Sequence, residues 1–142
     1  MKADKALPLI ALLAVAFIGV KALTAPDVAP SAAILLANDT SFDRILEKDP
    51  PLKLVEFGAP WCPPCRRLQP TLNKLADWQT NTLAVVQIDF DESPALAEEH
   101  KVTAIPALFL YRGSEVITST SARSYADLQA LVNKHTPNGK TP

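Results

Sequence analysis

The sequence predicts an α/β domain with a mixed central sheet, in which parallel strands and a C-terminal antiparallel hairpin are flanked by helices on both faces. Two observations support this fold class. Apolar runs of strand length alternate along the chain with segments in which apolar residues recur at helical spacing. Such alternation is typical of parallel strands joined by right-handed crossovers. The last two strand-like runs are separated only by a turn at residues 112–114, which indicates a hairpin.

The N-terminal third of the predicted domain contains a strand, a helix and a second strand. Residues 34–37 form a short apolar run that fits an edge strand. Ser41 is a suitable N-cap for a helix whose apolar face begins at Phe42, and the sequence Asp-Pro-Pro at 49–51 ends that helix. Residues 52–57 are then expected to form a buried strand.

A long helix, a strand and a short helix follow. The long helix is predicted from residue 62 to residue 79 because leucines recur along it at helical spacing, and Pro70 is expected to kink it. Residues 83–90 (LAVVQIDF) predict a second buried strand. The short helix over 94–100 begins with a proline, a residue that is favoured in the first turn.

The C-terminal part is predicted to consist of two hairpin strands, 107–111 and 115–120, and a final amphipathic helix. One face of this helix carries four apolar residues: Tyr125, Leu128, Leu131 and Val132. The predicted domain therefore covers residues 34–136, and residues 137–142 are expected to form a disordered tail.

Composition and charge exclude several classes of protein. Hydrophobic residues make up 48% of the 142 residues and charged residues 20%, proportions that suit one globular domain with a short appendage. The net charge of −1 comes without any block of lysine or arginine, so nucleic acid is not expected as a partner. Two cysteines three positions apart cannot form a disulfide scaffold, and a closed four-ligand zinc site is not expected. We therefore assign neither a metal nor a cofactor.

The N-terminal residues predict export. Residues 1–23 contain the uncharged run ALPLIALLAVAFIGV between lysines, which is either a signal anchor or a signal peptide. No suitable cleavage site follows closely, so we favour the anchor. Because the basic N-terminus stays in the cytoplasm, a single span would hold the domain on the periplasmic side of the bacterial inner membrane, and cleavage would release it into the periplasm. Residues 24–33, rich in Ala and Pro, are expected to form a semi-rigid linker.

Cys62 and Cys65 form the motif with the clearest chemical meaning, Trp-Cys-Pro-Pro-Cys. A predicted strand ends at Phe57, and Cys62 lies at the start of the next helix, where unpaired backbone amides and the helix dipole favour a thiolate. A second cysteine one turn later can resolve a mixed disulfide. We therefore predict that Cys62 attacks and that Cys65, the more buried of the two, resolves. Half of a zinc knuckle or a pair of inert core thiols is the alternative.

A metal carrier is an alternative from a different functional class. Two thiolates are suitable ligands for Cu(I) or zinc, and His100 or His135 would supply the third. Otherwise we expect both histidines to lie at the surface. The acidic residues at 89–92 and 98–99 are interpreted as a solvated loop and helix face.

These features together resemble the thioredoxin family. The stretch VEFGAPWCPPC at residues 55–65 looks like the family's active-site signature, and Pro70 falls where the family kinks its active-site helix. The segment VTAIPA at 102–107 resembles the cis-proline loop, and the first cysteine lies 44 residues before Pro106 (106 − 62), as in a plain thioredoxin without insertion. The resemblance covers about residues 34–135. It implies the thioredoxin fold and thiol–disulfide exchange.

The resemblance also implies roles for individual residues. Pro106 would follow a cis peptide bond and face the cysteine pair, leaving the backbone of Ile105 free to pair with an extended substrate. Glu56 stands where the family keeps a buried acid, usually aspartate. Burial would raise its pKa and allow it to relay a proton to or from Cys65. The motif residues expected to contact the substrate are Trp61, which would also shield the disulfide, Pro63 and Pro64.

The sequence departs from the family's pattern at several positions. Gly58 stands where many members have a second tryptophan, so the site is expected to be less walled. Gln87 replaces a lysine often found near the buried acid, so Glu56 is expected to lack that partner. Ser114 and Ala122 replace usual glycines, which argues against recognition by a standard thioredoxin reductase. Glutamate as the acid is more typical of membrane-anchored thioredoxin-like proteins of cytochrome c maturation, although their common insertion is missing.

The two prolines between the cysteines indicate the direction of electron flow. Neither has an N–H, so only the Cys65 amide and those after it can donate to a Cys62 thiolate. A strongly oxidising protein requires a highly stabilised thiolate, so we predict a reductant of disulfides in exported proteins. Its implied partners are these disulfide or dithiol substrates and a membrane electron donor, and we expect a monomer. A periplasmic oxidase or isomerase is the alternative.

Overall fold

The structure, a computed structural model, describes residues 28–78 and 81–136. Within these ranges the elements follow in the order β1 (Leu35–Ala37), α2 (Phe42–Leu46), β2 (Leu52–Gly58), α3 (Pro63–Trp78), β3 (Leu83–Asp89), α4 (Pro94–Glu99), β4 (Ala107–Arg112), β5 (Glu115–Thr120) and α5 (Tyr125–His135). Each predicted element is present, with limits that differ from the expected ones by a few residues at most.

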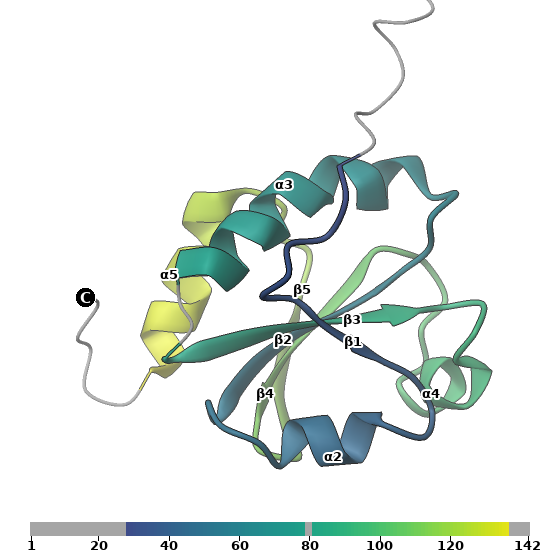
Figure 1. Cartoon of the computed structure of the whole chain (residues 1–142), viewed down its shortest axis with the longest axis horizontal. Coiled ribbons are helices and arrows are strands. Elements are labelled where there is room, and N and C mark those ends of the chain that lie inside the picture. Colours follow the sequence, from purple (N-terminus) through teal and green to yellow (C-terminus); the bar gives the residue numbers. More distant parts are fainter. Residues whose placement is uncertain (1–27, 79–80, 137–142) are drawn as a thin grey trace, which may run out of the picture.

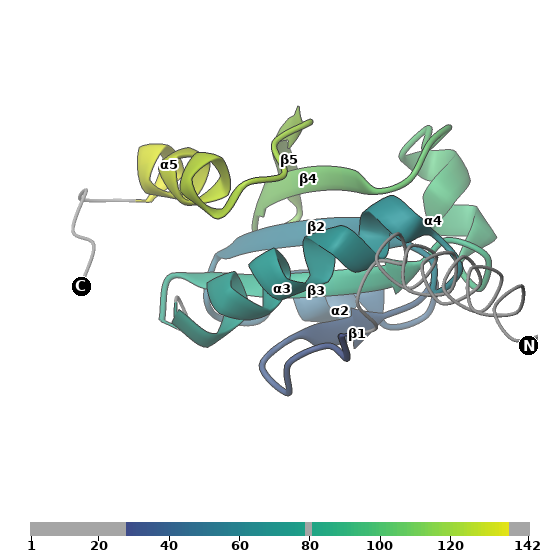
Figure 2. The ribbon, with the colours of Figure 1, turned by 90° about the horizontal axis from the view of Figure 1, so that it is seen from above.

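The strands form one mixed sheet in the order β1–β3–β2–β4–β5. Both β1 and β2 pair in parallel with β3, whereas β4 pairs antiparallel with β2, and β5 antiparallel with β4. Figure 2 shows the sheet face on, with this order of strands from β5 to β1. Figure 1 shows the sheet from its edge, with α3 and α5 on one side of it and α2 on the other. The predicted fold class, a mixed sheet that ends in an antiparallel hairpin, is confirmed.

Side chains on β2 alternate between two cores, one on each face of the sheet. The core under α3 and α5 includes Leu54 and Leu128, and the core under α2 and α4 includes Phe57 and Leu96. Figure 2 shows α3 in front of the sheet and α2 behind it. Glu56 is two residues from Leu54 and therefore shares its face, so the acid is directed toward α3.

A fully buried lysine in β2 is a feature that sequence analysis missed. The Lys53 ammonium group donates hydrogen bonds to the carbonyl oxygens of Leu46, Lys48 and Pro50, in the segment that joins α2 to β2. The Asp49–Pro50 peptide bond in this segment is cis. Burial lowers the pKa of Lys53, and the negative charge of Asp49 opposes that effect. Three carbonyls thus replace the water that the ammonium group loses.

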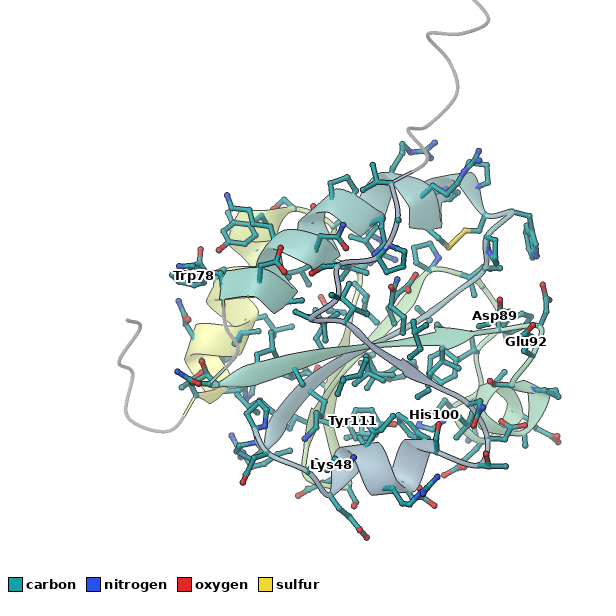
Figure 3. The ribbon with its side chains drawn as sticks, viewed as in Figure 1. Lys48, Trp78, Asp89, Glu92, His100 and Tyr111 are labelled. Atoms are coloured by element: carbon teal, nitrogen blue, oxygen red, sulfur yellow. A yellow bond between two sulfur atoms is a disulfide. The ribbon has the colours of Figure 1, made fainter. Side chains whose placement is uncertain are left out.

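The expectation that both histidines lie at the surface is wrong for His100, which is half-buried among aromatic rings, whereas His135 is partly exposed at the end of α5. His100 Nδ1 lies 2.8 Å from the carbonyl oxygen of Leu96, which can only accept, so Nδ1 carries the proton and Nε2 accepts from the Tyr111 hydroxyl. Figure 3 shows His100 and Tyr111 close together above α2. The imidazole packs among four aromatic rings: Phe42, Phe57, Phe109 and Tyr111.

The predicted N-terminal apolar segment, residues 24–27 of the predicted linker and the predicted tail lie outside the described residues. Within 28–78 and 81–136, no helix is long and apolar enough to cross a membrane. Membrane attachment therefore stays a prediction.

Candidate active site

The cysteine pair lies at the N-terminal end of α3, immediately after the loop that follows β2. Cys62 and Cys65 form a disulfide with their Cα atoms 5.3 Å apart, drawn in yellow in Figure 3. Because α3 begins at Pro63, Cys62 occupies the N-cap position. Its Sγ accepts a hydrogen bond of 3.3 Å from the Cys65 N–H, the first amide that the sequence leaves available.

The two prolines limit the hydrogen bonds that the Cys62 sulfur can receive. A side chain at an N-cap accepts from the N–H groups of the second and third helical residues. Pro64 is the second residue of α3 and has no N–H, so the third residue, Cys65, supplies the bond. Pro63, at the first position, would not be a capping donor even if it had an N–H. Both prolines are exposed, where a substrate can reach them.

Both cysteines are buried in the oxidised state. Cys62 is 2% exposed and Cys65 is 7% exposed, so the expectation that Cys65 is the more buried is wrong. Ala59 and Ile105 pack against the pair, and Cys62 Sγ lies 3.9 Å from the Ile105 carbonyl oxygen. Burial therefore does not distinguish the predicted attacking cysteine from the predicted resolving cysteine. The prediction that Cys62 attacks rests on its position at the start of α3.

The proline loop lies beside the disulfide. The Ile105–Pro106 peptide bond is cis, as expected, and Ile105 packs against the cysteine pair. Arg123, between β5 and α5, donates from Nη2 to the Pro106 carbonyl oxygen at 2.7 Å. This exposed guanidinium group at the edge of the site was missed by sequence analysis, because no local pattern connects residue 123 with residue 106.

Trp61 offers a large apolar surface next to the pair. It is 63% exposed, and its indole Nε1–H donates to Asp91 Oδ2 at 2.6 Å. Asp89 Oδ1 in turn accepts from the backbone N–H groups of Asp91 and Glu92, at 2.9 and 3.4 Å (Figure 3 labels Asp89 and Glu92 on this loop). The acidic segment that we interpreted as solvated therefore also orients the tryptophan.

Glu56 is a buried acid with one neutral partner. It is 2% exposed, and the register of β2 on β3 places it beside Gln87. Gln87 Nε2 donates to Glu56 Oε2 at 2.9 Å. Desolvation raises the pKa of Glu56 to about 7, while the Gln87 hydrogen bond and the positive charge of Arg123 oppose that rise. A neutral amide thus occupies the position of the family's frequent lysine.

Gly58 provides the space that the Glu56 carboxyl group fills. Residues 56 and 58 of β2 point to the same face of the sheet. A Cβ atom placed on Gly58 would overlap Glu56 Oε1, so any side chain at residue 58 would displace the acid. We expected the absence of a tryptophan at residue 58 only to open the site. The structure shows that Glu56 can adopt this conformation only because residue 58 has no side chain.

Glu56 and Cys65 both line one cavity of about 450 Å³. Its lining includes Glu56, Gly58 and Cys65, together with residues 28–30. A cavity of this size can hold water, and water can carry a proton between a carboxyl group and a thiol that do not touch. The geometry therefore allows Glu56 to exchange a proton with Cys65.

The metal-carrier alternative loses its proposed third ligand. Both ring nitrogens of His100 are engaged, one with the Leu96 carbonyl oxygen and the other with the Tyr111 hydroxyl. In the part of the chain that the structure describes, no group of three or more His, Cys, Asp or Glu side chains is placed to hold a metal ion.

Comparisons with known proteins agree with this geometry. The thioredoxin family model matches residues 33–134. The thioredoxin of Bacillus subtilis is 38% identical over 104 residues, which is 72% of this chain and 98% of that protein. The thioredoxin of Porphyra purpurea is 34% identical over 99 residues, 68% of this chain and 92% of that protein. A solved structure, that of a mutant thioredoxin from Halobacterium salinarum NRC-1, matches with a TM-score of 0.67 at 29% identity and covers 81% of this chain and 100% of that one.

The family match, the fold and the cysteine pair agree with one another. The matched residues include the whole sheet, the redox pair and the cis-proline loop. The chain therefore belongs to the thioredoxin family, and it is a thioredoxin-like thiol–disulfide oxidoreductase of the protein-disulfide reductase type.

Proposed function

We propose that the protein reduces disulfides of exported proteins, with Cys62 as the attacking thiol, Cys65 as the resolving thiol and Glu56 as the proton relay. The observation that carries this proposal is that, among the residues that the structure describes, one N–H group, that of Cys65, donates to the Cys62 sulfur. Because Pro64 removes the other capping donor, the reduced form has a less stabilised thiolate. A dithiol whose reduced form is weakly stabilised passes its electrons on readily.

The exchange takes place in two balanced steps. The Cys62 thiolate attacks one sulfur of the substrate disulfide, a bond forms between them, and the other substrate sulfur leaves as a thiolate that takes up a proton. Glu56 then accepts the Cys65 proton, and the Cys65 thiolate attacks the Cys62 sulfur. The Cys62–Cys65 disulfide forms as the bond between Cys62 and the substrate breaks, and the second substrate sulfur leaves as a thiolate that takes up a proton, so two electrons have passed to the substrate.

Residues around the pair support binding of an extended peptide. The cis bond before Pro106 leaves the backbone of Ile105 beside the disulfide, where a substrate strand can form main-chain hydrogen bonds. Trp61 contributes exposed aromatic surface, and Pro63 and Pro64 complete an apolar rim. These residues would contact the segments that flank the substrate's cysteine.

Export is supported by the N-terminal sequence, an uncharged run of 15 residues between lysines, residues 6–20. In the periplasm the disulfide produced by each cycle needs a membrane protein that donates electrons through its own thiols. Digestion by an external protease in spheroplasts, but not in intact cells, would support this location, and protection in spheroplasts would contradict it.

A redox titration against glutathione tests the direction of electron flow. We expect a reduction potential near that of thioredoxin, about −270 mV, and recovery of the pair in the reduced state from cells. A potential above about −150 mV would instead identify an oxidase or isomerase. Tight Cu(I) binding without any disulfide reduction would favour the metal carrier.

A trapping experiment tests the two cysteine roles. In Cys65→Ser the resolving thiol is absent, so Cys62 should remain in mixed disulfides whose partners mass spectrometry can identify. Cys62→Ser is the matched control and should trap nothing. If that control alone accumulates partners, the assignment of attack and resolution is reversed.

A further inference from the structure

A row of polar side chains extends along α3 behind the redox pair. At four-residue spacing after Cys65 the helix carries Gln69, Asn73 and Asp77, and residues four apart lie on the same face of a helix. Gln69 is buried, Asn73 is half-buried and Asp77 is exposed. None of these three residues belongs to either hydrophobic core, so packing does not explain why polar residues recur here.

Hydrogen bonds connect this row to Glu56. Gln87 Nε2 donates to Glu56 Oε2 at 2.9 Å, and the Gln87 and Gln69 amides donate to each other at 2.9 and 3.2 Å. Gln69 Nε2 also donates to Asn73 Oδ1 at 2.9 Å. A continuous chain of three amides therefore leads from the buried acid to Asn73.

Asn73 binds the segment that enters the domain. Its Nδ2 donates to the Ala29 carbonyl oxygen, and its Oδ1 accepts from the Ser31 N–H, both at 2.9 Å. The Ser31 hydroxyl donates to Asp77, the next member of the row. Part of the predicted linker is thus held on α3, and residues 28–30 form one wall of the cavity that contains Glu56.

The Ala29 carbonyl oxygen and the Ser31 N–H also fix the orientation of every amide in this row of hydrogen bonds. A carbonyl oxygen only accepts and an N–H only donates, so the Asn73 amide has one favourable orientation. Its Oδ1 then faces Gln69, the Gln69 oxygen faces Gln87, and Gln87 presents its N–H to Glu56. The segment at 29–31 therefore determines that Gln87 turns its N–H toward Glu56 and donates a hydrogen bond, instead of turning its amide oxygen toward the acid.

We propose that Asn73 is a positioning residue for Glu56. Asn73 holds Ala29 and Ser31 on α3, which keeps residues 28–30 in place as a wall of the acid's cavity, and it orients the amides that lead to the acid. This inference rests on the proposed proton relay and names the residues that limit the access of bulk water to the acid. The segment next to the predicted anchor is then a part of the active site.

Charged groups around the cavity are few. Arg66 of α3, Asp89 at the end of β3 and Glu92 in the loop after it line the same cavity, and the positive charge of Arg123 also acts on Glu56. Residues 28–31 carry no charged side chain, and Cys65 does not titrate in the disulfide. The Ser31 hydroxyl contacts the charged Asp77 at the exposed end of the polar row, but no charged side chain lies on the segment itself. Release of the segment would therefore change the access of water to Glu56 without removing a charged group from the lining of the cavity.

Asn73→Leu in the full-length oxidised protein, kept in mild detergent, tests the proposal. The Ser31 amide should exchange with solvent about tenfold faster, because it loses its acceptor. Desolvation is the largest influence on Glu56 and outweighs the hydrogen bond from Gln87. The pKa of the Glu56 carboxyl group, measured by carbon NMR, should therefore fall by about one pH unit as water enters.

Two further variants make the result specific. Lys74→Leu introduces the same residue at the next position of α3, where the lysine contacts the Tyr125 ring, and should leave the Glu56 titration unchanged. Ser31→Pro removes the N–H on the segment itself and leaves the helix intact, so it should reproduce the fall if Asn73→Leu fails to fold. Faster Ser31 exchange with a Glu56 pKa that rises, or moves by less than about 0.3 pH unit, would overturn the proposal.

Kinetics separate this inference from the proposed function. If Glu56 relays the proton, the pH profile of disulfide reduction by Asn73→Leu should shift with the Glu56 titration. A titration that shifts while the rate profile stays in place would retain the role of Asn73 and reject the relay. A titration that does not move would reject the role of Asn73 and leave the relay intact.

Discussion

Replacing Glu56 with glutamine should remove a pH-dependent destabilisation of the oxidised protein. Burial raises the pKa of Glu56 from 4.5 to about 7. Between these two values the folded state retains a proton that the unfolded state has released. The free energy of unfolding therefore falls as the pH rises through this interval, and the full cost is present above pH 7.

The structure sets the size of this effect. A pKa difference of one pH unit corresponds to about 1.4 kcal/mol, so ionised Glu56 costs the folded state about 3 kcal/mol at pH 8. At pH 5 most of that cost is absent because folded Glu56 is protonated. Glutamine preserves an acceptor for Gln87 and carries no charge. The stability advantage of Glu56→Gln should consequently grow by about 2–3 kcal/mol between pH 5 and pH 8.

Urea unfolding of the oxidised proteins, followed by tryptophan fluorescence at several pH values, measures this difference. Glu115→Gln is the matched control, because Glu115 is exposed on β5 and its removal should leave the pH dependence of wild type. If Glu56→Gln shows the same pH dependence as the control variant, then Glu56 is not held in a desolvated site and the reasoning fails.

Three other substitutions, together with a control for the third, test separate parts of the structure. Lys53→Met should lower the free energy of unfolding by about 2–4 kcal/mol in urea, because three carbonyls lose a charged donor. Tyr111→Phe should lower it by about 1–2 kcal/mol, because the His100 Nε2 loses its donor. Pro64→Ala should raise the reduction potential by about 20 mV in a glutathione titration, because it adds a second capping N–H. Pro63→Ala should leave the potential within about 5 mV of wild type.

For each of these substitutions, one result would contradict the physical explanation given for it. A Lys53→Met protein as stable as wild type would mean that the carbonyls bind water without cost. An unchanged stability in Tyr111→Phe would mean that the imidazole is already satisfied without the hydroxyl. Equal shifts for Pro63→Ala and Pro64→Ala would contradict the account of Cys62 as an N-cap.

Most of the fold could be predicted because its signals are local and periodic. The leucines of α3 recur at helical spacing, and the turn at 112–114 joins two strand-like runs, so neither element depends on distant residues. Lys53 could not be placed in the same way. A lysine in an apolar strand pattern gives no indication that three carbonyls from the preceding segment surround it.

The features of the site can likewise be divided into those with a local sequence signal and those that depend on tertiary structure. The cysteine pair and the cis-proline loop are contiguous motifs, and the pairing of Glu56 with Gln87 follows from parallel strands in register. The contact of Arg123 with the Pro106 carbonyl oxygen depends on tertiary structure and has no sequence signal. The polar row on α3 did have one, since polar residues recur every four positions after Cys65.

The three departures around the acid are best understood as one unit. Glutamate is one methylene longer than aspartate, so its carboxyl group reaches over residue 58, and only glycine leaves room for it there. A lysine at residue 87 would favour the charged carboxylate and lower its pKa, whereas Gln87 donates a hydrogen bond without adding charge. With desolvation dominant, Glu56 titrates near pH 7. Gly58 and Gln87 thus keep the acid able both to give and to accept a proton at neutral pH, which is the property that alternating attack and resolution require.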